Sequence, residues 1–206
     1  MRGIIPRAME QMGKYKLERE AQGWEYRMEV TFVEIYNESI RDLLRSGAVG
    51  TSDDNKHEIK KDMEGNLFVS DAVIMPIDPN DTSQVEAVLE LASRHRSVGF
   101  TAMNERSSRS HSVFTLHLRA KNAEQGTLLK GTLSLVDLAG SERLDRSCAS
   151  GDRMKETVAI NKSLSALTDV FAAIGNKQTH IPFRNSKLTY LLQSALSGDG
   201  KTLMVR

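Results

Sequence analysis

Hydroxyl, amide and guanidinium groups crowd one short run of the chain, residues 104–111, which reads Asn-Glu-Arg-Ser-Ser-Arg-Ser-His. The run immediately precedes Phe114, Leu116 and Leu118, whose period-2 spacing predicts a half-buried strand. Serine hydroxyls are compact and neutral, and they both donate and accept hydrogen bonds, so they suit a hydrated Mg²⁺ ion and phosphate oxygens. Taken alone, the run is equally typical of a serine-rich turn.

A second motif, Asp-Leu-Ala-Gly-Ser-Glu at residues 137–142, closes a nearly continuous apolar run at 133–138 that is typical of a central strand. In doubly wound sheets ligands bind beyond the carboxyl ends of strands, where an aspartate such as Asp137 can hold the water shell of Mg²⁺. Gly140 lets a backbone N–H approach a phosphate closely. The alternative is an aspartate that caps a turn, because D-x-x-G by itself is common.

Further periodic segments surround the two motifs. The alternation at 26–32 predicts another strand, and apolar spacing predicts helices over 83–96, 164–174 and 188–196. Ser83 and Glu86 have the spacing of a capping box, Gly175 should end the second helix, and Pro182 precedes the third. Loops are expected at 46–56, 76–80 and 141–152. Strands mixed with helices of this length predict an α/β layered fold.

Composition restricts the class of protein. The 206 residues are 27% charged and 39% hydrophobic, with a formal net charge of +1, so an acidic partner must be bound by a local patch. A single cysteine, Cys148, favours a reducing, intracellular compartment. No apolar run approaches the length of a membrane span, and the N-terminus does not resemble a signal peptide. We therefore expect neither a membrane nor a nucleic acid as partner.

Taken together, the two motifs resemble switch I and switch II of the kinesin superfamily, which are ATP-driven motors. The resemblance implies a mainly β central sheet flanked by helices, of the P-loop NTPase class, and the cofactors ATP and Mg²⁺. It places Ser108 at the Mg²⁺ ion and the γ-phosphate, and Asp137 at the Mg²⁺ water shell. It also implies that the Gly140 N–H senses the γ-phosphate.

The resemblance assigns roles to four further residues. Asn104 and Ser107 would organise the site and its attacking water. Arg109 and Glu142 would form a salt bridge that closes the two switches over ATP, an arrangement that a γ-phosphate orders and its loss releases.

The resemblance continues through 160–167 and 180–189, which in kinesins are the relay helix and the loop and helix after it, and which contact microtubules. Residues 153–190 contain six basic and two acidic residues, so the local net charge is positive and suits the acidic surface of tubulin. A modest basic patch is otherwise usually a solvated face. The residues expected to bind tubulin are Lys155, Asn161, Lys162, His180, Arg184 and Lys187.

Two residues depart from the family pattern within the relay helix. Val158 stands where kinesins commonly have Gln, and Thr168 where they commonly have Gly. A β-branched residue is tolerated in a helix, so we expect at most a shift in helix packing.

A kinesin also needs the G-x-x-x-x-G-K-[ST] loop that holds its phosphates. The candidate at 198–202 is rejected, because a helix precedes it and an apolar strand is expected after it, whereas a P-loop follows a strand and begins a helix. Residues 3–8 resemble the segment that shortly follows the P-loop in kinesins. The resemblance therefore implies that residues 1–206 are a partial motor domain that begins just after the P-loop and ends before the last strand and helix. The strand ending at Asp137 should then have an unpaired edge, and the chain alone should not hydrolyse ATP at a motor-like rate.

The subfamily is indicated by residues 23–26 and 57–60 and by the switch region, which look most like the C-terminal-motor, minus-end-directed kinesins. The parent protein would be a homo- or heterodimer on cytoplasmic microtubules, including those of the spindle. The alternative function is a nucleotide-independent, microtubule-binding module with motor homology. A GTPase is excluded because the base-reading motif N-K-x-D is absent: Leu164 stands in place of the aspartate.

Overall fold

The computed structural model describes residues 3–45, 57–98, 106–140, 152–198 and 200–205, and the structural statements below concern these residues. Among them no helix is both long enough and apolar enough to cross a membrane.

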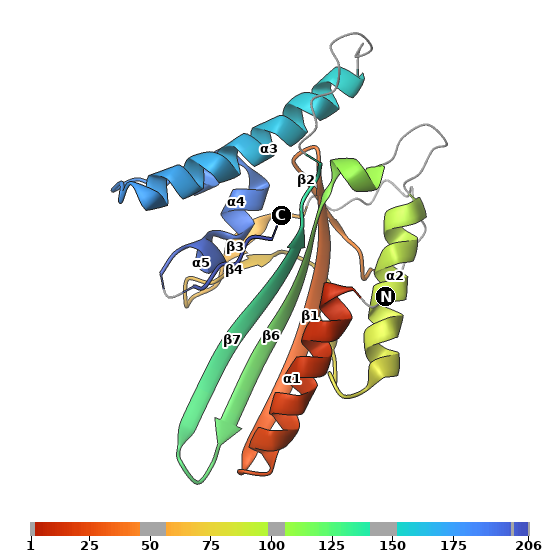
Figure 1. Ribbon diagram of the computed structural model, residues 1–206, viewed down its shortest axis with the longest axis vertical. Helices are drawn as coiled ribbons and strands as arrows, with labels where there is room; N and C mark the ends of the chain where they lie inside the picture. Colours follow the sequence, from red (N-terminus) through yellow and green to blue (C-terminus); the bar gives the residue numbers. More distant parts are fainter. Residues whose placement is uncertain (1–2, 46–56, 99–105, 141–151, 199, 206) are drawn as a thin grey trace.

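An antiparallel sheet forms the centre of the fold, and its strands are β1 (Trp24–Tyr36), β2 (Ser39–Asp42), β5 (Met75–Pro76), β6 (His111–Asn122) and β7 (Thr127–Asp137). Neighbouring strands follow the order β2-β1-β6-β7, and β5 pairs with β1 (Figure 1). This arrangement confirms an α/β fold with a central sheet, but its pairs are antiparallel. The rule for parallel, doubly wound sheets therefore does not explain where the two motifs lie.

Two helices, α1 (Ile4–Glu20) and α2 (Thr82–Val98), cover one face of the sheet (Figure 1). Their apolar side chains join those of the even-numbered positions of β1 and β6 in one core, which contains Met9, Met28, Val30, Phe32, Val85, Val88, Ala92, Phe114 and Leu116. Within it the rings of Phe32 and Phe114 meet edge to face at 5.5 Å. The sequence analysis had not predicted α1.

The opposite face carries α3 (Asp152–Gly175), η2 (Phe183–Asn185), α4 (Lys187–Leu191) and α5 (Gln193–Leu196). The odd-numbered positions of β1 and β6 face this side, and the second core contains Val33, Ile35, Ile40, Val113, Leu188 and Leu192. Because successive residues of a strand point to opposite faces, the alternation seen in the sequence supplies both cores.

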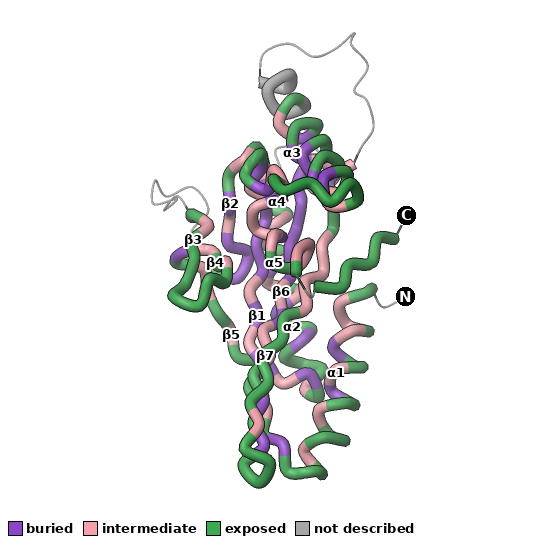
Figure 2. The backbone as a smooth tube through the Cα atoms, turned by 90° about the vertical axis from the view of Figure 1, so that its left-hand side faces the viewer, coloured by how far each residue is buried: buried purple, intermediate pink, exposed green. Residues whose placement is uncertain are grey.

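A small hairpin of β3 (Ile59–Lys61) and β4 (Leu67–Val69) lies beside α4 and α5 (Figure 1). Figure 2 shows that buried residues gather where the helices cover the strands. By contrast, most residues of β7 in the half near its hairpin with β6 are exposed.

Several expected details differ in the structure. Asp81, not Ser83, caps α2, because its Oδ1 accepts from the backbone N–H groups of Ser83 and Gln84. The helix expected at 188–196 is split at Leu192 into α4 and α5. The N-terminus of α4 is capped by Ser186, whose Oγ accepts from the Thr189 N–H.

The predicted end of α3 at Gly175 is confirmed, and so is the helix before 198–202. The strand expected after that segment does not form: residues 200–205 are irregular, and Leu203 is 87% exposed. Among the described residues β7 pairs with β6 alone, so it is an edge strand, although its apolar run looked like a central strand.

Candidate functional site

The two motifs meet at one end of the sheet. Because β6 and β7 are antiparallel, with Ser112 opposite Asp137, the start of one strand lies beside the end of the other. The short helix η1 (Arg106–Arg109) leads into β6, and the loop after β7 passes next to it. There the Gly140 N–H donates to the carbonyl oxygen of Ser108 at 2.8 Å. Residues 32 positions apart are thus held together by the backbone.

Asp137, the last residue of β7, forms an ion pair with Arg96 from the last turn of α2. The Nη1 atom of Arg96 lies 3.1 Å from Oδ2 of Asp137, whose side chain is 68% exposed. The same guanidinium reaches Oε1 of Glu34 at 3.9 Å and the carbonyl oxygen of Ser110 at 3.5 Å. Arg96 therefore ties α2 to both motifs.

Glu34 of β1 is fully buried beneath this end of the sheet. Its Oε1 accepts a hydrogen bond of 2.7 Å from Oγ of Ser110, which is also fully buried. A buried carboxylate is tolerated only with such partners, so the cluster must form for the chain to fold.

His111, the first residue of β6, links the second motif to α3. Its Nδ1 lies 3.0 Å from the Ala139 N–H and its Nε2 lies 2.8 Å from Oγ of Ser163. Burial lowers the pKa of His111 to about 4, and the Asp137 carboxylate opposes that shift. The ring is therefore neutral at physiological pH.

The structure brings Ser108, Gly140 and Asp137 to one place, with Arg109 in the same short helix as Ser108. Arg109 lines a small depression shared with His111 and with Ser163 of α3. Asn104 and Glu142 lie outside the described residues, as do the predicted loops at 46–56 and most of 141–152. Ser107 belongs to η1, but its side chain is not described, so the roles proposed for it and for the Arg109–Glu142 pair stay predictions.

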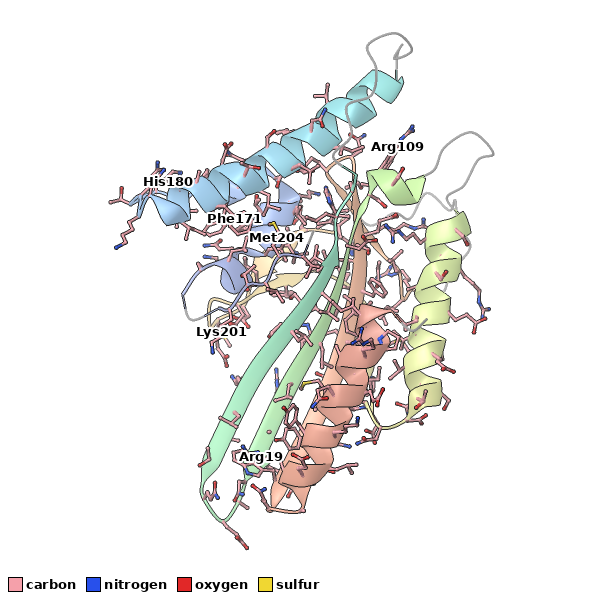
Figure 3. The ribbon with its side chains drawn as sticks, viewed as in Figure 1. Arg19, Arg109, Phe171, His180, Lys201 and Met204 are labelled. Carbon is pink, nitrogen blue, oxygen red and sulfur yellow. The ribbon has the colours of Figure 1, made fainter. Side chains whose placement is uncertain are left out.

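The residues expected to bind tubulin lie along α3 and beyond its end. Asn161, Lys162, His180 and Arg184 are exposed, Lys187 is half-buried, and Lys155 lies in α3 with a side chain outside the described set. Figure 3 shows Arg109 and His180 near opposite ends of α3.

Two contacts fix the segment after α3. The guanidinium of Arg184 lies 5.5 Å from the centre of the Tyr190 ring. The backbone N–H of Lys187 donates to Oε2 of Glu38 at 2.9 Å, which anchors the start of α4 to the turn between β1 and β2.

The two departures from the kinesin pattern lie on the outer face of α3. Val158 is 58% exposed, and Thr168 is exposed with its hydroxyl bonded to the carbonyl oxygen of Leu164 at 3.1 Å. Neither side chain packs against the core, so the expected shift in helix packing has no basis in the described contacts.

Four residues that build this site were not predicted from the sequence: Glu34, Arg96, His111 and Ser163. His111 is the last residue of the motif at 104–111, and this position was the only signal in the sequence that could have identified it. Each of the other three has a partner far away in sequence, at 41 residues for Arg96, 52 for Ser163 and 76 for Glu34, separations that no local pattern reports.

Comparison with known proteins agrees with the geometry. The kinesin motor domain family matches residues 1–206. The kinesin-like protein KIN-14D of Arabidopsis thaliana is 51% identical over 98% of this chain, which spans 27% of that protein. A solved structure of the C-terminal motor and motor homology domain of Kar3Vik1, fused to a synthetic heterodimeric coiled coil, is 47% identical with a TM-score of 0.85, and 98% of this chain covers 51% of it.

A second solved structure, a KIF14 dimer in a two-heads-bound state with AMP-PNP and a microtubule, is 34% identical with a TM-score of 0.83. Here 97% of this chain covers 57% of the solved one. The chain thus spans about a quarter of the curated relative and just over half of the two solved chains. It belongs to the kinesin motor-domain family, and its relatives include C-terminal kinesins of the kinesin-14 group.

Proposed function

We propose that this chain is the switch-and-relay part of a microtubule-based, ATP-driven motor. The observation that carries the proposal is the hydrogen bond between Gly140 and Ser108, which joins the two motifs beside the start of β6. From there the polar contacts of His111 lead to α3. A nucleotide-sensing segment and a tubulin-binding helix are thereby parts of one connected structure.

The residues present fit ATP with Mg²⁺. Serine hydroxyl and aspartate oxygens are the hard ligands that Mg²⁺ prefers, and the exposed carboxylate of Asp137 leaves room for water around the ion. Ser108 and Asp137 would hold the metal, and when bound it would neutralise charge on the phosphate oxygens. Among the described residues no group of three or more His, Cys, Asp or Glu gathers.

Two residues must rearrange if Gly140 and Asp137 act as proposed. The Gly140 N–H already donates to Ser108, so it reaches a phosphate only after that bond opens. Arg96 already pairs with Oδ2 of Asp137, and it competes with a metal-bound water for that oxygen. Each contact would therefore have to open before Gly140 and Asp137 could take up the roles proposed for them.

Tubulin would bind the exposed face of α3 and the segment leading to α4. We define the basic surface as Lys162, His180, Arg184 and Lys187, which lie there with the exposed amide of Asn161. The likeness to a KIF14 structure in complex with a microtubule supports this assignment. By the same resemblance the parent protein would be a dimer on cytoplasmic and spindle microtubules.

A nucleotide-independent binding module is the second candidate. It is favoured by the closed contact between Gly140 and Ser108, which satisfies the amide without any phosphate. A motor homology domain also forms part of the related Kar3Vik1 structure.

Microtubule co-sedimentation across a salt series, with and without ATP, tests these proposals. We expect salt-sensitive binding that Arg184→Ala weakens and Arg19→Ala does not, because Arg19 is exposed at the end of α1 far from His180 (Figure 3). Equal loss in both variants would contradict the basic surface. With the full-length protein, release by ATP would support the motor, and binding indifferent to ATP would support the binding module.

A further inference from the structure

The imidazole of His111 lies between two segments of the proposed motor, the second motif and α3. It is only 3% exposed, and it lies between the peptide that precedes Gly140 and the middle of α3. Its partners, Ala139 and Ser163, are 28 and 52 residues away in sequence. The proposed function uses these contacts only as a static connection to α3 and gives the ring no part in a movement.

The direction of each hydrogen bond follows from the donors available. The Ala139 N–H can only donate, so Nδ1 of His111 must carry a lone pair. The Ser163 hydroxyl donates to the carbonyl oxygen of Ile160 at 2.8 Å, so it must accept from Nε2–H of the ring. A single arrangement, the neutral ring protonated at Nε2, satisfies all three contacts. The low pKa of His111 agrees with it.

We propose that His111 is a positioning residue that transmits a displacement of the Ala139–Gly140 peptide to α3 through Ser163. The inference rests on the proposed function, because it supposes that the Gly140 amide leaves Ser108 for a phosphate. That step rotates the backbone at Ala139, whose amide is bonded to the ring. An imidazole is rigid and planar, so it moves as one body and carries the change to the Ser163 hydroxyl.

A purely structural role makes different predictions. If His111 only satisfies buried groups, its loss and that of Ser163 act as independent packing defects, and their effects multiply. If the ring connects the two segments, removing either end of the connection removes all of it. A double variant then costs no more than the more damaging single variant.

The first experiment measures hydrogen exchange at the Ala139 amide in the full-length protein, without nucleotide. We expect Ser163→Ala to speed exchange at Ala139, because the ring loses the partner that fixes its orientation, whereas exchange at Leu116, buried in β6, stays unchanged. Ser163→Thr, which keeps a hydroxyl, should restore the slow exchange. Unchanged exchange at Ala139 in Ser163→Ala would overturn the proposal, and this readout requires no ATPase activity.

The second experiment measures, in the full-length protein, the ratio of microtubule-stimulated to basal ATP turnover for His111→Gln, Ser163→Ala and the double variant. We expect each single variant to lower the ratio about fivefold or more, the usual scale of coupling between sites. The double variant should match the more damaging single variant, and Ser163→Thr should recover the ratio. Multiplying effects, or an unchanged ratio in Ser163→Ala, would overturn the positioning role. An unmodified protein with no turnover would instead contradict the proposed function, and the exchange result would still stand.

Discussion

Two regions of the molecule hold polar and charged side chains in different surroundings, one buried and the other exposed to water. The buried polar cluster, which we define as Glu34, Arg96, Ser110 and His111, lies under the two motifs, and three of its four residues are at most 4% exposed, with Arg96 largely covered. The basic surface along α3 and α4 is mostly exposed. The first region is fixed by folding, because each charge needs its partner once water is excluded. The charges of the second region need no partner within the fold, because water solvates them, so they remain available to bind an acidic partner.

This difference predicts where mutations act. Removing one partner of a buried ion pair leaves an uncompensated charge, which costs about 3–5 kcal/mol, whereas exposed pairs contribute about 0–1 kcal/mol. Changes in the cluster should therefore alter stability before they alter binding, and changes on the basic surface should do the reverse.

The largest effect is expected from Arg96→Met. It removes the cation beside buried Glu34 and should lower the free energy of unfolding by about 3 kcal/mol, measured by urea denaturation. Arg94→Met is the matched control on the same helix: Arg94 is 67% exposed and pairs with Glu90, so the loss should be below about 0.5 kcal/mol.

A second variant tests the cause. Adding Glu34→Gln to Arg96→Met removes the buried negative charge, so part of the lost stability should return. Similar losses for Arg94→Met and Arg96→Met, or no recovery in the double variant, would erase the distinction between buried and exposed charge at this end of α2.

The next effect concerns pH. The pKa of His111 falls from 6.5 to about 4 because the ring is buried, so the folded state disfavours the proton. The stability that this contributes is fully present above about pH 6.5 and is lost as the pH falls towards 4, a total of about 3 kcal/mol. His111→Asn should flatten the dependence of the unfolding free energy on pH across that window.

His117 provides the comparison for this prediction. Burial lowers its pKa too, but it lies on β6 away from the motifs, so it contributes to the slope in both proteins. The difference between the native chain and His111→Asn isolates the single ring. An identical slope would mean that His111 takes up its proton in the folded state as readily as in the unfolded one, which contradicts its burial.

The contrast between the two regions also explains what the sequence could predict. Period-2 alternation predicted β1 and β6, a nearly continuous apolar run predicted β7, and the motifs placed Ser108, Asp137 and Gly140 at one site, because these signals are local. The excess of basic residues on and after α3 could be counted from the sequence for the same reason. The buried polar cluster could not be predicted, since Glu34 and Ser110 are 76 residues apart and only the pairing of β1 with β6 brings them together.

The errors have the same origin. Capping by Asp81 instead of Ser83 is a choice between neighbouring oxygen atoms that backbone geometry decides. The strand expected after the rejected loop does not form: residues 200–205 are irregular, and among the described residues they pair with no strand. A sequence reports the tendency of a segment, whereas these outcomes depend on what the rest of the fold supplies.

The smallest expected effect concerns the basic surface, where a substitution should change binding and leave stability almost unchanged. Lys162→Ala removes one exposed charge from the basic surface, so it should weaken microtubule affinity by about 0.2–1 kcal/mol, at most about fivefold, with almost no change in unfolding free energy. Lys14→Ala on α1, where Lys14 pairs with Glu10 at 3.0 Å, should change neither quantity by a comparable amount. Affinity measured at two salt concentrations should differ less for Lys162→Ala than for the native chain, since one screened contact is gone. If Lys162→Ala lowered stability as much as Arg96→Met, the exposed charge would be part of the folding core, and the separation of the two regions would fail.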